Sequence, residues 1–467
     1  MPAKPPPPAP PPPPAAPAFV GRERELAVLR ELRASGRAEL FVLYGRRRVG
    51  KTELLQQLCA DRPAIYFLAA QVRDKDNLRA YRDALAAALD DPLAASVEFP
   101  DWTSALDFTA ERARGERLVV VLDEFPYLCE ANKGMASLVQ RFWDTRGKKS
   151  SLMLVLCGSQ VSFMEREVLG ESSPLYGRRT GQRRLEPLSP IEALRFFPRW
   201  DLQDRVLAYS ILGGMPAYLQ RFDDGISLAE NVAREVLRPE GYLFDEVQFL
   251  LRSELTSPTT YNSILAAVAR GADKVGDIAL EVGVDTTTAN KYLTVLRELR
   301  FVEREVPLTD LNPLRSRRGV YRIADRFLAF HFRHVQPNVS LIHAGRGARV
   351  FEERVLPDFP RLYEEARDDF ILDHLLRSAA ELVGDEVVEA GRHRGGRRVR
   401  ALARTAGGAT IAALVVPEDA SAPQSARAEL ASIDGPFARP DHALLYRFSR
   451  HAEEPLVVEA VPRDRLG

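Results

Sequence analysis

The residue types that could do chemistry are first gathered in FVLYGRRRVGKTELLQQL, residues 41 to 58. Gly45, Gly50, Lys51 and Thr52 fit the pattern GxxxxGK[ST], with an apolar run before them and helix-forming residues after them. The glycines let main-chain N–H groups curl around a phosphate chain, and the N-terminus of the following helix adds partial positive charge. Lys51 would supply a point charge to the β and γ phosphates, and the Thr52 hydroxyl could ligate Mg²⁺. The predicted phosphate site comprises Gly45, Arg46, Arg47, Arg48, Val49, Gly50, Lys51, Thr52 and Glu53.

A second signal is the acidic pair that ends the apolar run RLVVVLDEF. If this run is a strand that ends beside the phosphate loop, Asp123 can hold Mg²⁺ through water and Glu124 can polarise the water that attacks in hydrolysis. Each signal has a competing interpretation when taken alone. The glycine loop could be an ordinary strand-to-helix turn, and the acidic pair a solvated strand end. Together they favour a nucleotide site.

Two further sets of residues could complete such a site. The run SLMLVLCGSQ ends in Gly158 and Ser159, and Ser159 could sense the γ-phosphate or orient the water, although small polar residues also serve as plain turn formers. Arg178 and Arg179 follow a glycine in SPLYGRRTGQRR. They could reach transition-state charge within the chain or from a neighbouring subunit, or they could be solvated or paired with nearby glutamates.

These residues need strands and helices that alternate along the chain. Continuous apolar runs at 40–44, 64–68, 117–122 and 151–157 are typical of buried parallel strands, and amphipathic segments lie between them. The sequence therefore predicts an α/β fold, with a three-layer phosphate-loop core over residues 19–185.

The remainder of the chain divides by composition and periodicity. Residues 1–18 are proline-rich and predict an extended tail, and residues 186–257 carry mostly helical spacing and predict a helical lid. Over residues 258–340, three helices with a turn at Gly283 and an N-cap at Asp285 precede two strands, which predicts a winged-helix domain. Residues 341–467 mix helix and short strands and predict an α/β C-terminal domain.

Composition sets limits on partners and location. The chain has 467 residues and a formal net charge of zero, so any nucleic-acid partner must be recognised by a local patch. Cys59, Cys129 and Cys157 lack metal-ligand spacing, which indicates reduced thiols. No apolar run approaches the roughly 18 residues of a membrane span. We expect a cytoplasmic protein that has no membrane partner.

With FVGRERE, GRRRVGKT, LVVVLDEF, LCGSQ, SPLYGRR and LGGMPAYL in this order, residues 19 to 335 resemble the archaeal-type ATPase family, which is related to AAA+ and STAND proteins. The resemblance implies that ATP and Mg²⁺ are the cofactors and that a helical lid and a winged helix follow the core. It also implies that Val20 and Gly21, within FVGRE, help to hold the adenine.

Family members often end in a domain similar to PD-(D/E)xK nucleases. This chain keeps an early Glu352, but its later strands read GRRVRALART and ATIAALVVP and hold no carboxylates for a metal. The resemblance therefore implies a degenerate, non-catalytic domain. A basic run in this region could bind a phosphate backbone or form a solvated hairpin, and it contains Arg392, Arg394, Arg397, Arg398, Arg400 and Arg404.

The predicted winged helix could contact double-stranded DNA. On its second helix Asn290 and Lys291, with Thr287 and Thr294, should be exposed. The arginines of the predicted wing, which would lie along the backbone, are Arg315, Arg317 and Arg318. We expect an ATP-hydrolysing switch that acts on DNA. An ATP-regulated nuclease, and a signalling or scaffold ATPase that self-associates or docks a protein partner, are the alternatives.

Overall fold

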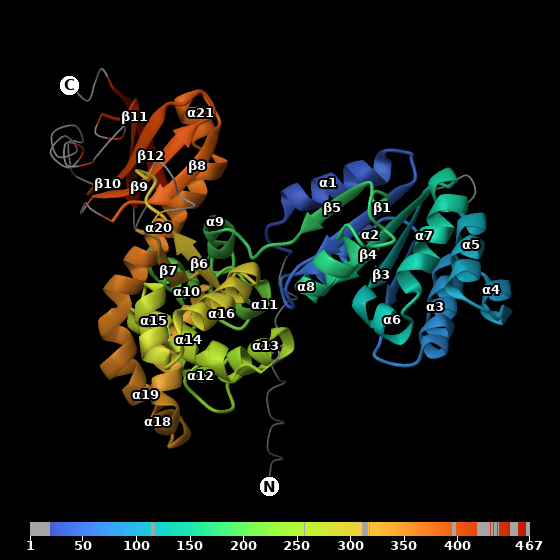
Figure 1. Ribbon diagram of the computed structural model, residues 1–467, viewed down its shortest axis with the longest axis horizontal. Helices are drawn as coiled ribbons and strands as arrows, with labels where there is room; N and C mark the ends of the chain where they lie inside the picture. The colour runs from blue at the N-terminus through green and yellow to red at the C-terminus, as the bar shows by residue number, and fades with distance from the viewer. Residues whose placement is uncertain are drawn as a thin grey trace, which may run out of the picture.

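Figure 1 shows a computed structural model in which the N-terminal α/β core lies apart from the helical and C-terminal regions. The strand β5 leads from this core toward α9. The structure describes residues 19–113, 117–255, 257–310, 316, 318–394, 398–417, 430, 433, 437, 439–448 and 456–463. The predicted tail over residues 1–18 therefore lies outside the described residues.

The core is a parallel five-stranded sheet in the order β2-β3-β4-β1-β5. Every residue of β1, β3 and β4 is buried, as continuous apolar runs predict for strands covered on both faces. The prediction of an α/β fold is confirmed. The strands are β1 (Glu39–Tyr44), β2 (Ala64–Leu68), β3 (Leu118–Asp123), β4 (Leu152–Gly158) and β5 (Gly181–Arg184).

Alternate residues of these strands belong to two separate apolar cores, one on each face of the sheet. Phe41 and Leu43 pack with Leu54 of α2 on one face, whereas Leu40 and Val42 pack on the other. Because side chains alternate along a strand, one continuous apolar run supplies both cores. The helices of this region are α1 (Glu23–Ala34), α2 (Lys51–Cys59), α3 (Asp74–Leu89), α4 (Pro92–Ser96), α5 (Trp102–Arg112), α6 (Phe125–Ala131), α7 (Met135–Thr145) and α8 (Val161–Phe163).

A helical region follows the core. Its capping boxes at Ser189 and Ser227 begin α9 and α12, where each serine side chain accepts from the backbone of the glutamate three residues later. The helices here are α9 (Pro190–Leu194), α10 (Leu202–Leu212), α11 (Pro216–Leu219), α12 (Leu228–Glu235) and α13 (Glu246–Glu254).

Three helices and a two-stranded antiparallel sheet come next. Gly283 ends the second of these helices in the left-handed conformation, and the Asp285 side chain accepts from Thr288 N at the start of the third. The two boundary signals read from the sequence are confirmed. The elements are α14 (Thr259–Arg270), α15 (Val275–Val282), α16 (Thr286–Glu298), β6 (Val302–Glu305) and β7 (Val320–Ile323).

The C-terminal region is a second five-stranded sheet, in the order β12-β11-β10-β9-β8, with α20 packed on it. The pair β10 and β11 is parallel and the other pairs are antiparallel. The strands are β8 (Val387–Arg392), β9 (Val399–Thr405), β10 (Thr410–Val415), β11 (His442–Phe448) and β12 (Leu456–Pro462). The helices are α17 (Arg326–Phe330), α18 (Val339–His343), α19 (Gly347–Val350), α20 (Phe359–Arg377) and α21 (Ala380–Val383).

The structure adds elements that the patterns did not reveal. β5, β8 and β12 were not among the predicted strands, because segments such as GQRR and VVEAGR are short or interrupted by charged residues and lack a clean apolar run. Across the described residues no helix is long and apolar enough to cross a membrane. The same residues contain no group of three or more His, Cys, Asp or Glu side chains able to hold a metal ion.

Candidate nucleotide site

The phosphate loop joins the end of β1 to the start of α2. Gly45 lies so close to the backbone of Leu185 that a Cβ at Gly45 would sit 2.4 Å from the carbonyl oxygen of Leu185. Gly50 has a φ of +93° and immediately precedes α2, which begins at Lys51. Glycine is therefore required at both ends of the loop, once for close approach and once for a left-handed backbone.

The Lys51 side chain is buried against the phosphate loop, which comes directly before Lys51 in the sequence. Its Nζ donates to the carbonyl oxygens of Gly45, at 2.8 Å, and of Arg46, at 3.0 Å. The side chain is 6% exposed and has no carboxylate partner among the described residues. An ammonium group held by neutral carbonyls keeps its charge available for a phosphate.

Thr52 and Asp123 meet beneath the loop. The Thr52 hydroxyl donates to Asp123 Oδ2 at 3.1 Å, and the Tyr66 hydroxyl on β2 donates to the same oxygen. The backbone N–H of Glu124 donates to the other carboxylate oxygen, Oδ1, at 2.9 Å. A hydroxyl and a carboxylate oxygen side by side next to a phosphate loop fit Mg²⁺, which takes few protein ligands and completes its shell with phosphate and water oxygens.

Glu124 has an unusual backbone and a defined partner. Its φ is +52°, in the left-handed region that a glutamate seldom adopts. The Ser159 hydroxyl, at the end of β4, donates to Glu124 Oε2 at 2.8 Å. Strained backbone of this kind gathers at functional sites, where the surroundings hold it in place. The pair brings together two residues that the sequence predicted for one site.

These residues line one side of a cavity of about 490 Å³. Charged and hydroxyl side chains of the loop and of the strand ends form one wall, whereas Phe19, Val20, Phe196, Pro216 and Ala217 contribute apolar surface. A volume of this size with mixed walls is typical of a site for a small ligand. The full lining is Phe19, Val20, Arg22, Arg47, Arg48, Gly50, Lys51, Thr52, Glu53, Glu124, Ser159, Phe196, Pro216, Ala217 and Gln220.

Arg22 belongs to this site but was not predicted from the sequence. It has a φ of +69°, and its Nη2 donates to the carbonyl oxygens of Val49, at 2.9 Å, and Glu186, at 2.6 Å. Burial lowers the pKa of the guanidinium from its usual value, against the opposing charges of Glu25 and nearby carboxylates. Gly21 precedes it against Leu188. Arg22 thus fastens the FVGRE segment to the phosphate loop.

Two loop arginines have carboxylate partners far along the chain, which no local pattern could indicate. Arg46 Nη1 lies 2.6 Å from Asp325 Oδ2, both side chains are less than a tenth exposed, and the guanidinium stacks on Phe301. Arg48 forms an ion pair with the buried Glu246 of α13. The phosphate loop is therefore joined to two regions outside the core, by a buried ion pair at Arg46 and by a partly exposed one at Arg48.

Arg178 and Arg179 are not brought to this cavity. They precede β5, which runs parallel to β1 with Gly181 beside Phe41. They therefore lie near the amino end of β1, whereas the phosphate loop follows its carboxyl end. Arg178 Nε donates to Asp144 at 2.9 Å. The expectation that they act on the nucleotide within their own chain is wrong for this structure. In the strand order of the core, β4 lies between β3 and β1, so Asp123 comes from the second strand away from β1.

The residues predicted for nucleic acid are partly described. Asn290 and Lys291 are exposed on α16, as are Thr287 and Thr294. Arg318 is exposed and its guanidinium lies 3.5 Å from Asp310. Arg315 and Arg317 lie outside the described residues. Glu352, the residue kept from the nuclease pattern, is exposed on a turn that packs against α12.

Two arginines of the arginine-rich run in the C-terminal domain are paired with acids instead of solvated. The Arg392 side chain is 13% exposed and pairs with Asp369 and Glu305, and Arg400 Nε lies 2.6 Å from Asp368 on α20. Solvation was one of the two interpretations left open for this run, and it is wrong for these two arginines. Arg397 lies outside the described residues.

A parallel sheet whose first strand enters a glycine loop and helix, with an acidic pair at the end of another strand, defines a P-loop nucleoside triphosphatase fold. A family model described as an ATPase domain predominantly from Archaea matches residues 19–222. An uncharacterised protein of Methanocaldococcus jannaschii is 33% identical over 360 residues, which cover 76% of this chain and 77% of that protein. The chain belongs to this family of ATPase-domain proteins, and ATP binding and hydrolysis are the activity at the level of the family.

Solved structures similar to the chain include the Walker-type ATPase of Pyrococcus abyssi, at 21% identity and a TM-score of 0.48, covering 68% of this chain and 96% of that one. The ORC2 protein of Aeropyrum pernix is similar at 14% identity and a TM-score of 0.34, covering 72% and 96%.

Proposed function

We propose that the protein is an ATP-hydrolysing switch in which the state of the phosphate site sets the positions of the helical and C-terminal regions. The observation that carries the proposal is the two ion pairs that leave the phosphate loop, Arg46 with Asp325, which is buried, and Arg48 with Glu246, in which only the glutamate is buried. They tie the element that grips phosphate to both regions that follow the core.

Each residue of the site has a role in this proposal. Lys51 and the loop N–H groups bind the phosphates, and Thr52 and Asp123 hold Mg²⁺, which supplies positive charge to the phosphate oxygens when bound. Glu124 accepts a proton from the attacking water, and Ser159 holds the Glu124 carboxylate in place.

The switch follows from competition for the loop arginines. A γ-phosphate offers three strong acceptor oxygens beside the loop, and Arg46 has two buried nitrogens, Nε and Nη2, that find no hydrogen-bond partner within the described ranges. Turning the guanidinium toward phosphate satisfies these nitrogens and releases Asp325. Asp325 also caps α17, accepting from Leu328 N at 2.9 Å, so its release reaches the start of the C-terminal region.

ATP turnover and binding test the enzymatic part. Glu124→Gln should bind ATP and lose roughly 100-fold or more of the turnover, the loss expected for a general base. Lys51→Ala should lose binding. Normal turnover in Glu124→Gln would remove Glu124 from the mechanism, and normal ATP binding in Lys51→Ala would overturn the site assignment.

Hydrogen exchange tests the switch separately. In the wild type a non-hydrolysable ATP analogue should raise exchange in peptides around Asp325 and Glu246, and Lys51→Ala should show no such change. Asp325→Asn should exchange rapidly around α17 without nucleotide. Tight analogue binding that leaves these peptides unchanged would refute the switch while leaving the ATPase assignment intact.

We also propose that residues 258–340 form a winged helix that binds duplex DNA. The exposed face of α16 carries Asn290, Lys291 and Arg297, while Leu293 and Leu296 are buried. Lys291→Ala combined with Arg297→Ala should weaken binding to a 30-base-pair duplex and reduce its salt dependence, whereas Arg349→Ala on α19 should not. A wild type without DNA affinity at low salt would favour the alternative of a protein-docking ATPase.

A further inference from the structure

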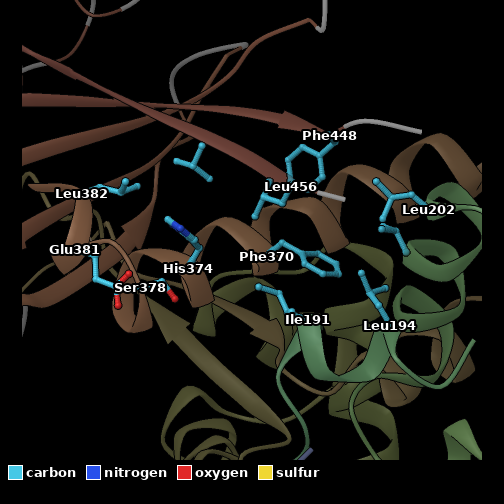
Figure 2. A pocket seen from close by; sticks show the side chains of 12 residues that line it. Ile191, Leu194, Leu202, Phe370, His374, Ser378, Glu381, Leu382, Phe448 and Leu456 are labelled. Carbon is cyan, nitrogen blue, oxygen red and sulfur yellow. The ribbon is translucent and has the colours of Figure 1, made fainter. Parts of the chain in front are cut away.

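A second cavity, of about 350 Å³, lies between the helical region and the C-terminal domain and shares no lining residue with the nucleotide cavity. Figure 2 shows side chains from α9 and α10 facing those of α20, α21, β11 and β12. Its volume is within the range of about 300–1,000 Å³ found for small-molecule sites, which often lie between domains. The lining is Ile191, Leu194, Leu202, Val206, Phe370, His374, Ser378, Glu381, Leu382, Phe448, Leu456 and Val458.

The interior of this cavity is apolar. Leu194 and Leu202 gather at one end, and Phe370 lies beside Leu456 in the middle. Val206, Phe370 and Leu194 are almost fully buried, so the wall at this end is built into the packed core. A small apolar group can move from water into this end of the cavity with little rearrangement of the protein, because the walls are already in place.

The other end carries the polar groups. Glu381 and Ser378 lie together there, with His374 next to them (Figure 2). The Nδ1 atom of His374 is 2.9 Å from the Tyr446 hydroxyl, and burial lowers the pKa of the imidazole, so this histidine is neutral at neutral pH. Glu381 is exposed at the mouth, and its carboxylate has no hydrogen-bond or ion-pair partner in the described part of the chain.

The charge of the lining selects the ligand. Of the described residues that line this cavity, Glu381 alone carries a formal charge at neutral pH, and the charge is negative. A cationic group is attracted to this mouth and an anionic one repelled, while the walls accept only apolar surface.

We propose that this cavity binds a small amphipathic amine, with the alkyl or aromatic body between Phe370 and Leu194 and the ammonium group at Glu381. The site is separate from the nucleotide site, and the proposal does not depend on the ATPase function. A ligand seated here touches α10 and α20 at once and so joins the helical region to the C-terminal domain.

Three probes of equal chain length test the proposal by calorimetry on the full chain: decylamine, decanol and decanoate, each below its micellar concentration. Decylamine should bind at one site per chain, about tenfold more tightly than decanol, the factor expected for one charge-assisted hydrogen bond at a partly exposed site. Decanoate should bind more weakly than decanol. Equal affinities for amine and carboxylate would overturn the proposal.

Variants locate the binding. Glu381→Gln should remove the preference for decylamine over decanol and keep decanol binding. Ile191→Trp, which fills the cavity from α9, should abolish binding of both. Leu376→Trp is the matched control, because Leu376 is 51% exposed on α20 and does not line the cavity. Decylamine binding that survives Ile191→Trp would refute the site.

The oligomeric state separates a ligand site from a surface between copies of the chain. If no probe binds, and the wild type is a dimer that Ile191→Trp dissociates, the face is a self-association surface and the proposal is wrong. Unchanged thermal unfolding of Ile191→Trp establishes that the variant is folded in either case.

Discussion

The phosphate site and the C-terminal layer both place charged side chains beside a five-stranded sheet, but these side chains have different partners. The C-terminal layer consists of Glu305, Arg326, Asp369 and Arg392. At the phosphate site Lys51, Thr52 and Glu124 border a cavity of about 490 Å³. In the C-terminal layer Arg326 and Arg392 face the carboxylate of Asp369. Charge that faces a cavity can act on a ligand, whereas charge that faces a counter-charge holds two elements together.

The C-terminal layer joins four elements through a few buried groups. Asp369 of α20 accepts from Arg326 Nε at 2.6 Å and also from Arg392 of β8, and Arg392 reaches Glu305 of β6. The arginines hold the pKa of Asp369 far below its ordinary value, in spite of its burial. The two acids of this layer, Asp369 and Glu305, are therefore both engaged with arginines.

Breaking the C-terminal layer should give the largest effect on stability. Asp369→Asn leaves Arg326 and Arg392 buried with less compensating charge, so the free energy of unfolding should fall by about 3–5 kcal/mol. Urea unfolding of the full chain measures the change. ATP affinity at low temperature should stay within about twofold, because Asp369 does not line the nucleotide cavity.

Asp83→Asn is the matched control for this variant. The Asp83 side chain is 64% exposed and pairs with its neighbour Arg82, so its removal should change stability by less than about 1 kcal/mol. A stability loss as small in Asp369→Asn as in the control would show that the C-terminal network is not holding its elements together.

Acid should weaken the folded state through His331, which is buried. Among the residues that the structure describes, neither ring nitrogen has a hydrogen-bond partner, and burial lowers the pKa of this imidazole to about 4. The unfolded chain takes up the proton near pH 6.5 and the folded chain only near pH 4. The free energy of unfolding should therefore fall by roughly 3 kcal/mol as the pH drops through this window.

His331→Leu should remove this part of the pH dependence, as measured by urea unfolding between pH 7 and pH 4. Glu305 provides an internal contrast, because Arg322 and Arg392 oppose the effect of burial and hold its pKa at about 2. Its contribution is present above about pH 4.5 and is lost toward pH 2, so it lies in a different window. An unchanged slope between pH 6.5 and pH 4 in His331→Leu would contradict the assignment.

A substitution at Gly214 should lower the stability of the protein. Gly214 follows α10 and packs against Leu188, which lies between β5 and α9. A Cβ at this position would lie 2.0 Å from the carbonyl oxygen of Leu188, whose N–H donates to Gly214 O at 2.8 Å. Gly214→Ala should cost about 1–3 kcal/mol through overpacking. It should also weaken ATP binding, since Pro216 of the same segment lines the nucleotide cavity.

Gly276→Ala is the control for this position. No atom lies within 4 Å of a Cβ built there, and the residue is inside α15, so the substitution should be neutral or slightly stabilising. Equal stability of the two alanine variants would mean that the close approach at Gly214 is not a constraint.

The two regions also differ in what the sequence could predict. The phosphate loop is continuous in sequence, and its glycines, Lys51 and Thr52 were identified by spacing alone. Asp123 and Glu124 were found because a buried strand leads to them. The ion pair between Arg46 and Asp325 spans 279 residues and depends on the packing of three regions, so no local pattern indicates it.

In the C-terminal sheet, too, the sequence did not indicate which residues pair. Its β9 segment, VRALART, places buried Ala401 and Ala403 between arginines, and the alternation is hidden because alanine is a weak apolar signal. The arginines were read as a candidate phosphate-binding or solvated run. The acids that pair with them lie on α20 and β6, remote in sequence.

The smallest effect is expected for the hydrogen bond between Tyr66 and Asp123. The experiment tests whether this bond orients Asp123 for Mg²⁺ or only stabilises the fold. The Tyr66 hydroxyl donates to the Asp123 oxygen that also accepts from Thr52. Tyr66→Phe should raise the Mg²⁺ concentration needed for half-maximal ATP binding about fivefold, because one hydrogen bond of about 1 kcal/mol no longer orients Asp123. Tyr81→Phe also removes a buried hydroxyl, which lies 2.8 Å from Thr109 and away from the cavity, and should leave the Mg²⁺ dependence unchanged. A lower Mg²⁺ requirement in Tyr66→Phe would mean that the hydroxyl competes with the cation for Asp123, so that the phosphate site, like the C-terminal layer, keeps its carboxylate partly engaged.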